Sequence, residues 1–571
     1  MIEQGNTVGV VGLGSLGLPL VELLVEAGVP VIAVDVDPAA VERARSRSIA
    51  AHNGMSVLSA ANLVVEAVPE HRETKRAVLR TIAEVCPPDT VLVSTTASLS
   101  LMALAAESGR PSKLVGLRFM VPPAPGGTCE VTRTAMSEAG AASAVDALVS
   151  RLPLAVKDFG SAQMLAWQLL LGYLNRAVSL YESGYATRED IDTAMKLGCG
   201  LPAGPLTLLD HLGVDSVRDE LAALHERTRR AAHAPAALLS DLVGRNRLGR
   251  KAGMGVYDYG AAGVVGSPRP DRTMNAVPRP VSRIGVVGSG TMGRGIAQVT
   301  ALGGFDTVLS ARTQEKAEAA IEAIDAAMVR AVRRGQIRPE ARRQALARIH
   351  PSSGYADLGD RDVVMEAVTE VEDIKAEVFG ALGRVCRPGA VLTTTTSSLS
   401  VADCAEAADR RADVVGMHFF HPAPVMGLVE VSRTEFTGDD VLATAHTLAR
   451  SLGKTPVNCT DRAGFIVNYL LFPYLNDAVA LVEAGAATIE ELDQAVENGL
   501  GHPLGPFALM DAIGLDVCEA IQKRLHDVND DPDIKSSAVL TALVASDRLG
   551  RKVGAGFYNH DLSPFHDVLG V

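Results

Sequence analysis

The chain has 571 residues, which at about 150 residues per domain suggests three to five domains. Its 54 Lys and Arg residues against 67 Asp and Glu residues give a net charge of −13, which argues against a surface that binds a polyanion such as nucleic acid. Apolar residues make up 47% and charged residues 21%, a composition that is typical of a globular enzyme and excludes a disordered protein.

The seven cysteines are scattered, with no CxxC pair and no Cys/His cluster, so the sequence indicates neither a disulfide scaffold nor a metal site. No apolar run reaches the roughly 18 residues that a membrane span needs. The apolar segment VGVVG at Val8 follows Met1 almost at once, with no basic or apolar signal segment before it. We therefore expect a soluble, cytoplasmic protein that associates with neither nucleic acid nor membrane.

The chain begins with short apolar strands that alternate with helical segments. Strands are predicted at VGVVG, VPVIAVD and TVLVST, and a short helix is predicted from Pro38 to about Ile49. This alternation is typical of a parallel sheet that is covered by helices on both faces.

The second half of the chain repeats the first. VVGLGSLG at Val10 recurs as VVGSGTMG at Val286, and VVEAVPE at Val64 recurs as VMEAVTE at Val364. Three further strings match in the same order. The chain is therefore predicted to hold two copies of one unit, here called copy one and copy two.

Each copy is predicted to be a Rossmann-type α/β domain followed by an all-α domain. The rear part of a copy has no alternating segments and holds long amphipathic runs, such as 465–484 and 489–499. The predicted segments are a Rossmann-type domain at 1–157, a helical domain at 158–260, a Gly- and Pro-rich linker at 261–281, a Rossmann-type domain at 282–458 and a helical domain at 459–571.

A GxGxxG motif stands directly between an apolar strand and a helix in each copy. In such a loop the first glycine allows a tight turn, the second lets the backbone approach a pyrophosphate, and the third lets helix and strand pack closely. The motif predicts a dinucleotide site, the alternative being a glycine-rich turn without a ligand. The glycines are Gly12, Gly14 and Gly17 in copy one and Gly288, Gly290 and Gly293 in copy two.

The end of the next strand indicates which cofactor binds. Copy one has Asp35 there, whose carboxylate would accept the ribose hydroxyls of NAD(H), so NAD(H) stays open as a ligand of copy one. Copy two has no carboxylate but the run Ser310, Ala311, Arg312 and Thr313, and an arginine beside hydroxyl groups can pair with a 2′-phosphate. We favour NADP(H) over NAD(H) in copy two. The alternative is that Arg312 stacks on the adenine or lies in solvent while NAD(H) binds.

Copy two resembles the L-3-hydroxyacyl-CoA dehydrogenase family, and the whole chain resembles a tandem fusion of two members. The matching strings run in order over nearly all of 282–560 and are GSGTMGRGIAQ, MEAVTE, TSSLS, GMHFFHPAPVMGLVEV, GFIVNYLLFPYLNDAV, GHPLGPFALMD and GRKVGAGFY. The resemblance implies a dinucleotide-binding domain, a helical domain that makes the family's dimer, and an active site in the cleft between them.

The resemblance assigns the family's catalytic histidine to His418 and its partner carboxylate to Glu430. It assigns the two residues that hold the substrate oxygen to Ser397 and Asn468. These types suit the interconversion of a secondary alcohol and a ketone, because a histidine that titrates near neutrality can move the proton at the oxygen. A carboxylate on the other ring nitrogen would fix the tautomer, and two donors would stabilise the oxygen as it gains negative charge.

Other positions near the reacting centre follow from the same resemblance. Glu370 and Lys375 match positions beside the nicotinamide ribose, the alternative being a charge pair at a helix start. Two departures from the family pattern lie here as well: His421 replaces an asparagine near the nicotinamide, and Thr395 replaces the asparagine before the serine motif.

Copy two also holds 24 more residues than copy one between its first two shared strings, within a helical pattern at about 314–350. In the family a helical hairpin at this place grips coenzyme A, whose phosphates would attract basic side chains. The alternative is a solvated charged face. The arginines on which this prediction rests are Arg330, Arg333, Arg334, Arg338, Arg342 and Arg343.

Copy one lacks the matching set. Ala97, Arg118 and Trp167 stand where copy two has serine, histidine and asparagine, and only Glu130 is kept. Arginine stays protonated, so Arg118 cannot be the base. We therefore predict that copy one is catalytically silent and forms an intramolecular pseudo-dimer with copy two, with further pairing of chains left open.

Together these inferences predict an oxidoreductase that interconverts 3-hydroxyacyl and 3-oxoacyl thioesters of CoA with a nicotinamide cofactor, at one active site in copy two. An alternative within the superfamily is a ketoreductase or alcohol dehydrogenase that acts on a polyketide, a carrier-protein thioester or a sugar acid. The alternative from another class is a dinucleotide-binding scaffold without turnover.

Overall fold

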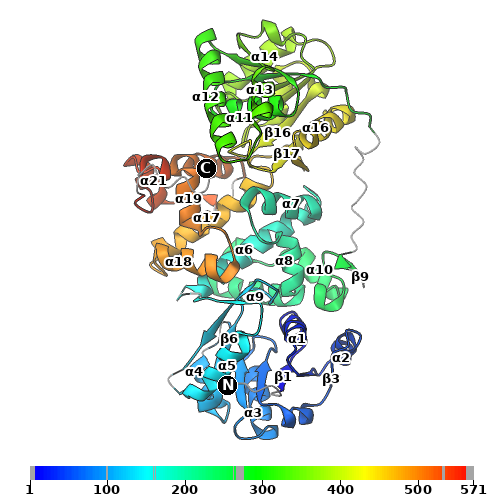
Figure 1. Cartoon of the computed structure of the whole chain (residues 1–571), viewed down its shortest axis with the longest axis vertical. Coiled ribbons are helices and arrows are strands. Elements are labelled where there is room, and N and C mark those ends of the chain that lie inside the picture. The colour runs from blue at the N-terminus through cyan, green and yellow to red at the C-terminus, as the bar shows by residue number, and fades with distance from the viewer. Residues whose placement is uncertain are drawn as a thin grey trace. The chain divides into compact units, whose positions relative to one another are not determined.

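The computed structural model describes residues 7–97, 99, 101–134, 136–158, 160, 162–260, 263–264, 276–529 and 534–560. Figure 1 draws the whole chain and labels its elements. The chain divides into two compact units, each built from three segments. Unit 1 contains Met1–Ser179, Pro205–Gly266 and Asp477–Asp511, and unit 2 contains Leu180–Gly204, Ser267–Asn476 and Ala512–Val571. Most of the predicted linker at 261–281 lies outside the described residues.

Unit 1 holds an eight-stranded sheet in the order β3-β2-β1-β4-β5-β6-β7-β8. Neighbouring strands are parallel except β6 and β7, which are antiparallel. Strands β1, β4 and β5 are buried along their whole length, which is why the sequence shows them as continuous apolar runs. The strands are β1 Val8–Val11, β2 Val31–Val34, β3 Ala51–His52, β4 Leu63–Glu66, β5 Val91–Ser94, β6 Leu114–Arg118, β7 Thr128–Thr132 and β8 Ala155–Val156.

Unit 2 repeats this sheet in the order β13-β12-β11-β14-β15-β16-β17-β18, again with a single antiparallel pair, β16 and β17. The strand order of both sheets is that of the Rossmann fold, so the predicted fold class is confirmed. The strands are β11 Arg283–Val287, β12 Asp306–Ala311, β13 Ile349–Ser353, β14 Val363–Glu366, β15 Val391–Thr394, β16 Val414–Phe419, β17 Leu428–Arg433 and β18 Thr455–Thr460.

Helices cover both faces of each sheet and make the rear part of each copy. Those that flank the sheets are α1 Gly17–Glu26, α2 Pro38–Arg45, α3 Arg72–Val85, α4 Leu101–Glu107, α5 Ala139–Val149, α11 Thr291–Leu302, α12 Gln314–Arg333, α13 Pro339–Leu346, α14 Glu372–Val385, α15 Val401–Ala407 and α16 Asp439–Ser451. The rear helices are α6 Gln163–Glu182, α7 Arg188–Cys199, α8 Pro205–Leu212, α9 Val214–Thr228, α10 Ala237–Gly244, α17 Val467–Glu483, α18 Ile489–Ala495, α19 Pro506–Ile513, α20 Leu515–Asn529 and α21 Ala538–Ala545.

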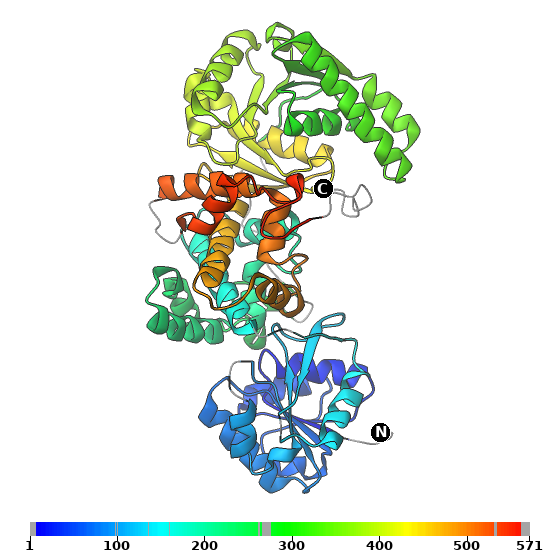
Figure 2. The same ribbon diagram turned by 90° about the vertical axis from the view of Figure 1, so that its left-hand side faces the viewer.

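Two predicted helices end earlier than expected. The helix predicted from Pro38 to Ile49 ends at Arg45, because Ser48 lies in the left-handed region with φ 63°. The pattern predicted as helical to residue 350 ends at Leu346, and His350 lies in strand β13, which pairs with β12. The helical hairpin of α12 and α13 is drawn in green in Figure 2.

The two units exchange helices between the copies. Helix α7 of copy one belongs to unit 2, where it packs on β17 and β18. There Asp190 accepts the backbone N–H of Asn458 (3.1 Å), and the Tyr185 hydroxyl donates to the carbonyl of Thr460 (2.9 Å). Helix α18 of copy two belongs to unit 1, where the hydroxyl of Thr128 donates to the carbonyl of Asn498 just beyond it (2.9 Å). Each Rossmann-type sheet is therefore backed by a helix of the other copy.

In the part of the chain that the structure describes, no helix is long and apolar enough to cross a membrane.

Candidate active site

The antiparallel strands β16 and β17 bring a histidine and a carboxylate face to face. His418 is the register partner of Glu430, and its Nδ1 donates to Glu430 Oε2 at 2.7 Å. Both groups are buried, with 7% of His418 and none of Glu430 exposed. The loop between the strands reverses the chain, which is how residues 12 apart come into contact. Since a carboxylate can only accept, the proton of a neutral imidazole lies on Nδ1 and leaves Nε2 as an acceptor.

The other oxygen of Glu430 is held by the start of helix α17. The backbone N–H groups of Ile466 and Val467 donate to Glu430 Oε1 at 3.0 and 2.9 Å. A carboxylate is favourable at this end of a helix because the first N–H groups have no partner within it. Phe465, just before, has φ 43°, a strained conformation for a bulky residue, and its ring packs 5.6 Å from that of His418. Asn468 follows directly and is 8% exposed.

Ser397 leaves the neighbouring strand β15 at the same edge of the sheet. Thr394 of β15 pairs with Gly416 of β16, so the residues beyond both positions emerge together. The backbone N–H of Ser397 donates to Glu370 Oε1 at 2.8 Å, while its hydroxyl is 3.5 Å from the same oxygen. The structure therefore brings Ser397 and Glu370 into one cluster and His418, Glu430 and the start of α17 into another along this edge.

Lys375 is a buried cation that ties this cluster to strand β14. Its Nζ lies 2.8 Å from Glu366 Oε1 and 3.3 Å from Glu370 Oε2, and 2% of the residue is exposed. Burial alone would lower the pKa of Lys375, but the carboxylates of Glu366 and Glu370 raise it above its ordinary value. Burial alone would raise the pKa of Glu370, but Lys375 and hydrogen bonds from Thr396 and Ser397 hold it below its ordinary value. The pair stays ionised and fixes the loop that carries Ser397.

The two positions that depart from the family pattern lie at the edges of the site. His421 is exposed on the loop after β16, and a cis peptide bond joins it to Pro422. The backbone N–H of Thr395 donates to the carbonyl of Glu366 at 3.0 Å.

The glycine loop of copy two has the shape that a dinucleotide requires. A Cβ on Gly288, which has φ 118°, would lie 2.4 Å from the carbonyl oxygen of Ala367, and one on Gly293 would lie 1.9 Å from that of Gly288. A Cβ on Gly290 would have no atom within 4 Å, so the second glycine faces open space. This pattern fits a phosphate that approaches the backbone at Gly290.

The run from Ser310 to Thr313, at the end of β12, is only partly available to a ligand. The hydroxyl of Ser310 is buried and donates to the carbonyl of Gly354 at 2.5 Å, so it does not face the cofactor edge. Thr313 caps helix α12 by accepting the N–H of Lys316 at 3.3 Å. Arg312 is exposed and is the side chain at this edge that could pair with a 2′-phosphate.

The arginines of the hairpin fall into two groups. Arg342 of α13 binds Asp325 of α12 with two hydrogen bonds of 2.6 and 2.7 Å, and Arg343 binds Glu340 at 2.7 Å. Arg342 therefore joins the two helices of the hairpin, and Arg343 forms a pair within α13. The exposed arginines near its tip are Arg330, Arg333, Arg334 and Arg338.

Copy one has a different network at the matching positions. Arg118 Nη1 donates to Glu130 at 3.2 Å and to Gln163 at 3.0 Å, and Gln163 donates to the carbonyl of Ala97 at 2.7 Å. The indole N–H of Trp167 donates to Glu220. Burial raises the pKa of Glu220.

Two residues that contact the site were not predicted from the sequence. Glu366 is the main partner of Lys375, and Thr396 donates to Glu370. A signal for Glu366 existed, because the glutamate recurs as Glu66 in the string shared by both copies. Among the described parts of the chain, no group of three or more His, Cys, Asp or Glu side chains is placed to hold a metal ion.

Comparison with known proteins finds the same two models in both copies. The model described as "3-hydroxyacyl-CoA dehydrogenase, NAD binding domain" matches residues 45–158 and 283–462. The model described as "3-hydroxyacyl-CoA dehydrogenase, C-terminal domain" matches residues 165–259 and 464–560.

Relatives of known annotation match about half of the chain. A 3-hydroxybutyryl-CoA dehydrogenase of Clostridioides difficile is 38% identical over 279 residues, which is 49% of this chain and 99% of that protein. A protein of the same name from Mycobacterium tuberculosis is 41% identical over 286 residues, 49% of this chain and 99% of that protein. The crystal structure of M. tuberculosis FadB2 is 40% identical with a TM-score of 0.49, and the match covers 49% of this chain and 100% of that one.

Proposed function

Because the chain belongs to the 3-hydroxyacyl-CoA dehydrogenase family, we propose that copy two interconverts 3-hydroxyacyl and 3-oxoacyl thioesters of CoA with a nicotinamide dinucleotide. The observation that carries the proposal is the buried contact of 2.7 Å between His418 and Glu430. The two relatives described above favour a short acyl chain, because both are 3-hydroxybutyryl-CoA dehydrogenases.

His418 moves the proton at the reacting oxygen. With its Nδ1 proton held by Glu430, Nε2 accepts the hydroxyl proton in oxidation and returns it in reduction. Glu430 stabilises the imidazolium that forms, and its orientation is fixed by the N–H groups of Ile466 and Val467. A bound nicotinamide ring supplies or accepts the hydride.

Ser397 and Asn468 orient the substrate oxygen from either side of His418. The backbone near each residue is anchored: the N–H of Ser397 is bound to Glu370, and Asn468 follows Val467, whose N–H is bound to Glu430. Donors fixed in this way can stabilise negative charge on the oxygen without reorganising during the reaction.

NADP(H) is the favoured cofactor, and CoA is bound by the hairpin. Arg312 is the exposed cation at the end of β12, where copy one has Asp35, and it would pair with a 2′-phosphate. The exposed arginines Arg330 and Arg333 near the hairpin tip would meet the CoA phosphates, whereas Arg342 serves the hairpin through Asp325.

Copy one serves as the fixed partner of copy two in an intramolecular pseudo-dimer. Its helix α7 approaches the catalytic elements so closely that a Cβ on Gly198 would lie 2.9 Å from a methyl carbon of Val467 and 3.1 Å from one of Leu428. Since the N–H of Val467 binds Glu430, this helix supports the position of the catalytic carboxylate.

The test is the initial rate with acetoacetyl-CoA, measured with NADPH and NADH in parallel. The proposal predicts turnover and a higher rate with NADPH. Turnover with NADH alone would contradict the role of Arg312 and leave the reaction standing. No turnover with either cofactor, from protein that binds NADPH, would contradict the thioester assignment and favour a ketoreductase with another substrate.

A further inference from the structure

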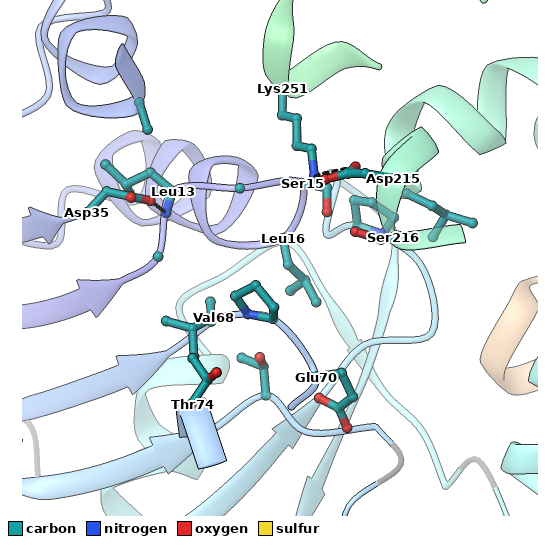
Figure 3. A pocket seen from close by; sticks show the side chains of 18 of the residues that line it. Leu13, Ser15, Leu16, Asp35, Val68, Glu70, Thr74, Asp215, Ser216 and Lys251 are labelled. Carbon is teal, nitrogen blue, oxygen red and sulfur yellow. Dashed lines mark hydrogen bonds and ion pairs between the residues drawn. The ribbon is translucent and has the colours of Figure 1, made fainter. Parts of the chain in front are cut away.

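Copy one contains a built pocket although its catalytic residues are replaced. The cavity has a volume of about 820 Å³ and lies within unit 1 (Figure 3). Its walls include the glycine loop, the end of β2, the loop after β4 and a set of residues between 212 and 252 from the rear part of copy one. A volume of this size falls in the range of cofactor sites.

The glycine loop of this pocket makes the same close contacts as the glycine loop of copy two. A Cβ on Gly12, which has φ 96°, would lie 2.6 Å from the carbonyl oxygen of Ala67, and one on Gly17 would lie 1.8 Å from that of Gly12. A Cβ on Gly14 would meet nothing within 4 Å. The turn therefore requires Gly12 and Gly17 for its own packing, while Gly14 leaves the backbone open to the cavity. That is the space a pyrophosphate occupies in a dinucleotide site.

A carboxylate stands at the ribose end of the pocket. Asp35 accepts the N–H of Leu13 at 2.6 Å and the N–H of Asp37 at 2.8 Å, so its carboxylate is held in place where β2 ends (Figure 3). Among the described residues that line this end, the arginine is Arg43, whose guanidinium lies 3.8 Å from Asp37. Two carboxylates against one guanidinium leave the end negative, which favours ribose hydroxyls and repels a 2′-phosphate.

Lys251 lines the pocket as a member of an ion pair. It lines the same pocket as Ser15 of the glycine loop, and its Nζ lies 2.6 Å from Asp215 (Figure 3). Both charged groups belong to the wall formed by residues between 212 and 252.

The positions that carry the histidine, the serine and the asparagine of copy two hold Arg118, Ala97 and Trp167 in copy one. Arg118 donates hydrogen bonds to Glu130 and Gln163. Trp167, which lines the pocket, donates to Glu220. A permanently protonated arginine stands where the base would be. A nucleotide could bind here without being turned over.

We propose that copy one is a binding site for NAD(H) without turnover, with a nucleotide preference opposite to that of copy two. A chain built in this way responds to the NAD(H) pool through one copy while it reacts through the other. The binding claim stands whether or not copy two acts on a CoA thioester; only the contrast in preference depends on the proposed function.

The single tryptophan of the chain makes this site measurable by itself. Trp167 lines the copy-one pocket, so its emission should be quenched by energy transfer to a reduced nicotinamide bound there. The full-length protein is titrated with NADH and, separately, with NADPH. We expect saturable quenching by NADH and at least about tenfold weaker binding of NADPH, as expected for loss of hydrogen bonds to a charged group.

Two matched variants assign the signal to a copy. Gly14→Ala places a methyl group in the space of the pyrophosphate without touching the protein, and Gly290→Ala does the same in copy two. Gly14→Ala should abolish the quenching, and Gly290→Ala should leave it intact. Absence of saturable quenching in the native protein, quenching that survives Gly14→Ala, or equal binding of NADPH would each overturn the proposal. Turnover of acetoacetyl-CoA plays no part in this readout, so the two proposals fail independently.

Discussion

The two Rossmann-type domains share one frame and differ at its reacting end. Lys75 lies 2.7 Å from Glu66 in copy one, as Lys375 lies 2.8 Å from Glu366 in copy two. Both glycine turns have the same close contacts. The histidine that faces a carboxylate across the antiparallel pair in copy two is Arg118 in copy one.

The residues that would hold a nucleotide and the residues that would move a proton can therefore be lost separately. In copy one an arginine donates to the carboxylate of Glu130, and the two strands still pair antiparallel within a sheet of the same strand order. The frame is constrained by packing, because a side chain on Gly12 or Gly17 would collide with backbone. The base is constrained only by the reaction.

The largest difference between the copies is expected when the same change is made in both carboxylates. Glu430→Gln would present an amide N–H to His418 Nδ1 and so favour the tautomer whose Nε2 cannot accept a proton. We expect kcat to fall by about a hundredfold to ten-thousandfold. Glu130→Gln in copy one should leave kcat unchanged. Steady-state rates of the two purified variants check this, and equal losses would mean that both copies take part in turnover.

The next comparison exchanges the charge at the cofactor edge. Arg312→Asp gives copy two the charge that copy one has at Asp35. The ratio of kcat/KM for NADPH to that for NADH should fall about tenfold to a hundredfold, because a charge-assisted contact to the phosphate is lost and a repulsion is gained. Rates with both cofactors provide the measurement. An unchanged ratio would remove Arg312 from the account of cofactor choice.

A third comparison tests whether copy one supports the site of copy two. Gly198→Ala adds a methyl group 2.9 Å from the side chain of Val467, and overpacking of this kind costs about 1–3 kcal/mol of unfolding free energy. We expect lower stability in urea and a reduced kcat in the fraction that stays folded, since Val467 holds Glu430. Gly244→Ala in helix α10 is the matched control, because a methyl group there meets nothing within 4 Å. A Gly198→Ala enzyme with native kcat would mean that α7 does not support the catalytic pair.

The smallest expected effect concerns the hairpin that copy one lacks. Arg330→Ala should raise KM for acetoacetyl-CoA a few fold with kcat unchanged, because exposed charges contribute about 0.2–1 kcal/mol each. The effect should shrink as salt is added. Arg245→Ala, which removes a surface pair with Asp241 in copy one, is the control and should leave KM unchanged. A KM unaffected by Arg330→Ala at low salt would make this part of the hairpin a solvated face.

The repeat and the spacing of apolar runs were enough to predict both sheets. Strands that are buried on both faces are visible as continuous apolar runs, and the glycine turns mark where the first strand of each copy ends. The loop after His418 also made its approach to Glu430 foreseeable, because a short reversal between two strands leaves few registers.

Contacts made by tertiary docking could not be predicted in the same way. The exchange of α7 and α18 leaves no trace in a periodic pattern, because a helix has the same apolar stripe whichever copy it packs on. The hydroxyl of Ser310 was expected at the cofactor edge, but it binds the carbonyl of Gly354, which is 44 residues away. The bond between Lys375 and Glu366 likewise depends on how α14 folds back on β14.

The central claim is that turnover resides in copy two alone, and the most direct measurement compares His418→Ala with Arg118→Ala. Turnover of acetoacetyl-CoA is followed with saturating NADPH, and folding of both variants is checked by the unfolding transition in urea. The account predicts that His418→Ala abolishes turnover while Arg118→Ala leaves it nearly unchanged. Comparable losses in two folded variants would contradict a silent copy one, and a fully active His418→Ala would contradict the active site itself.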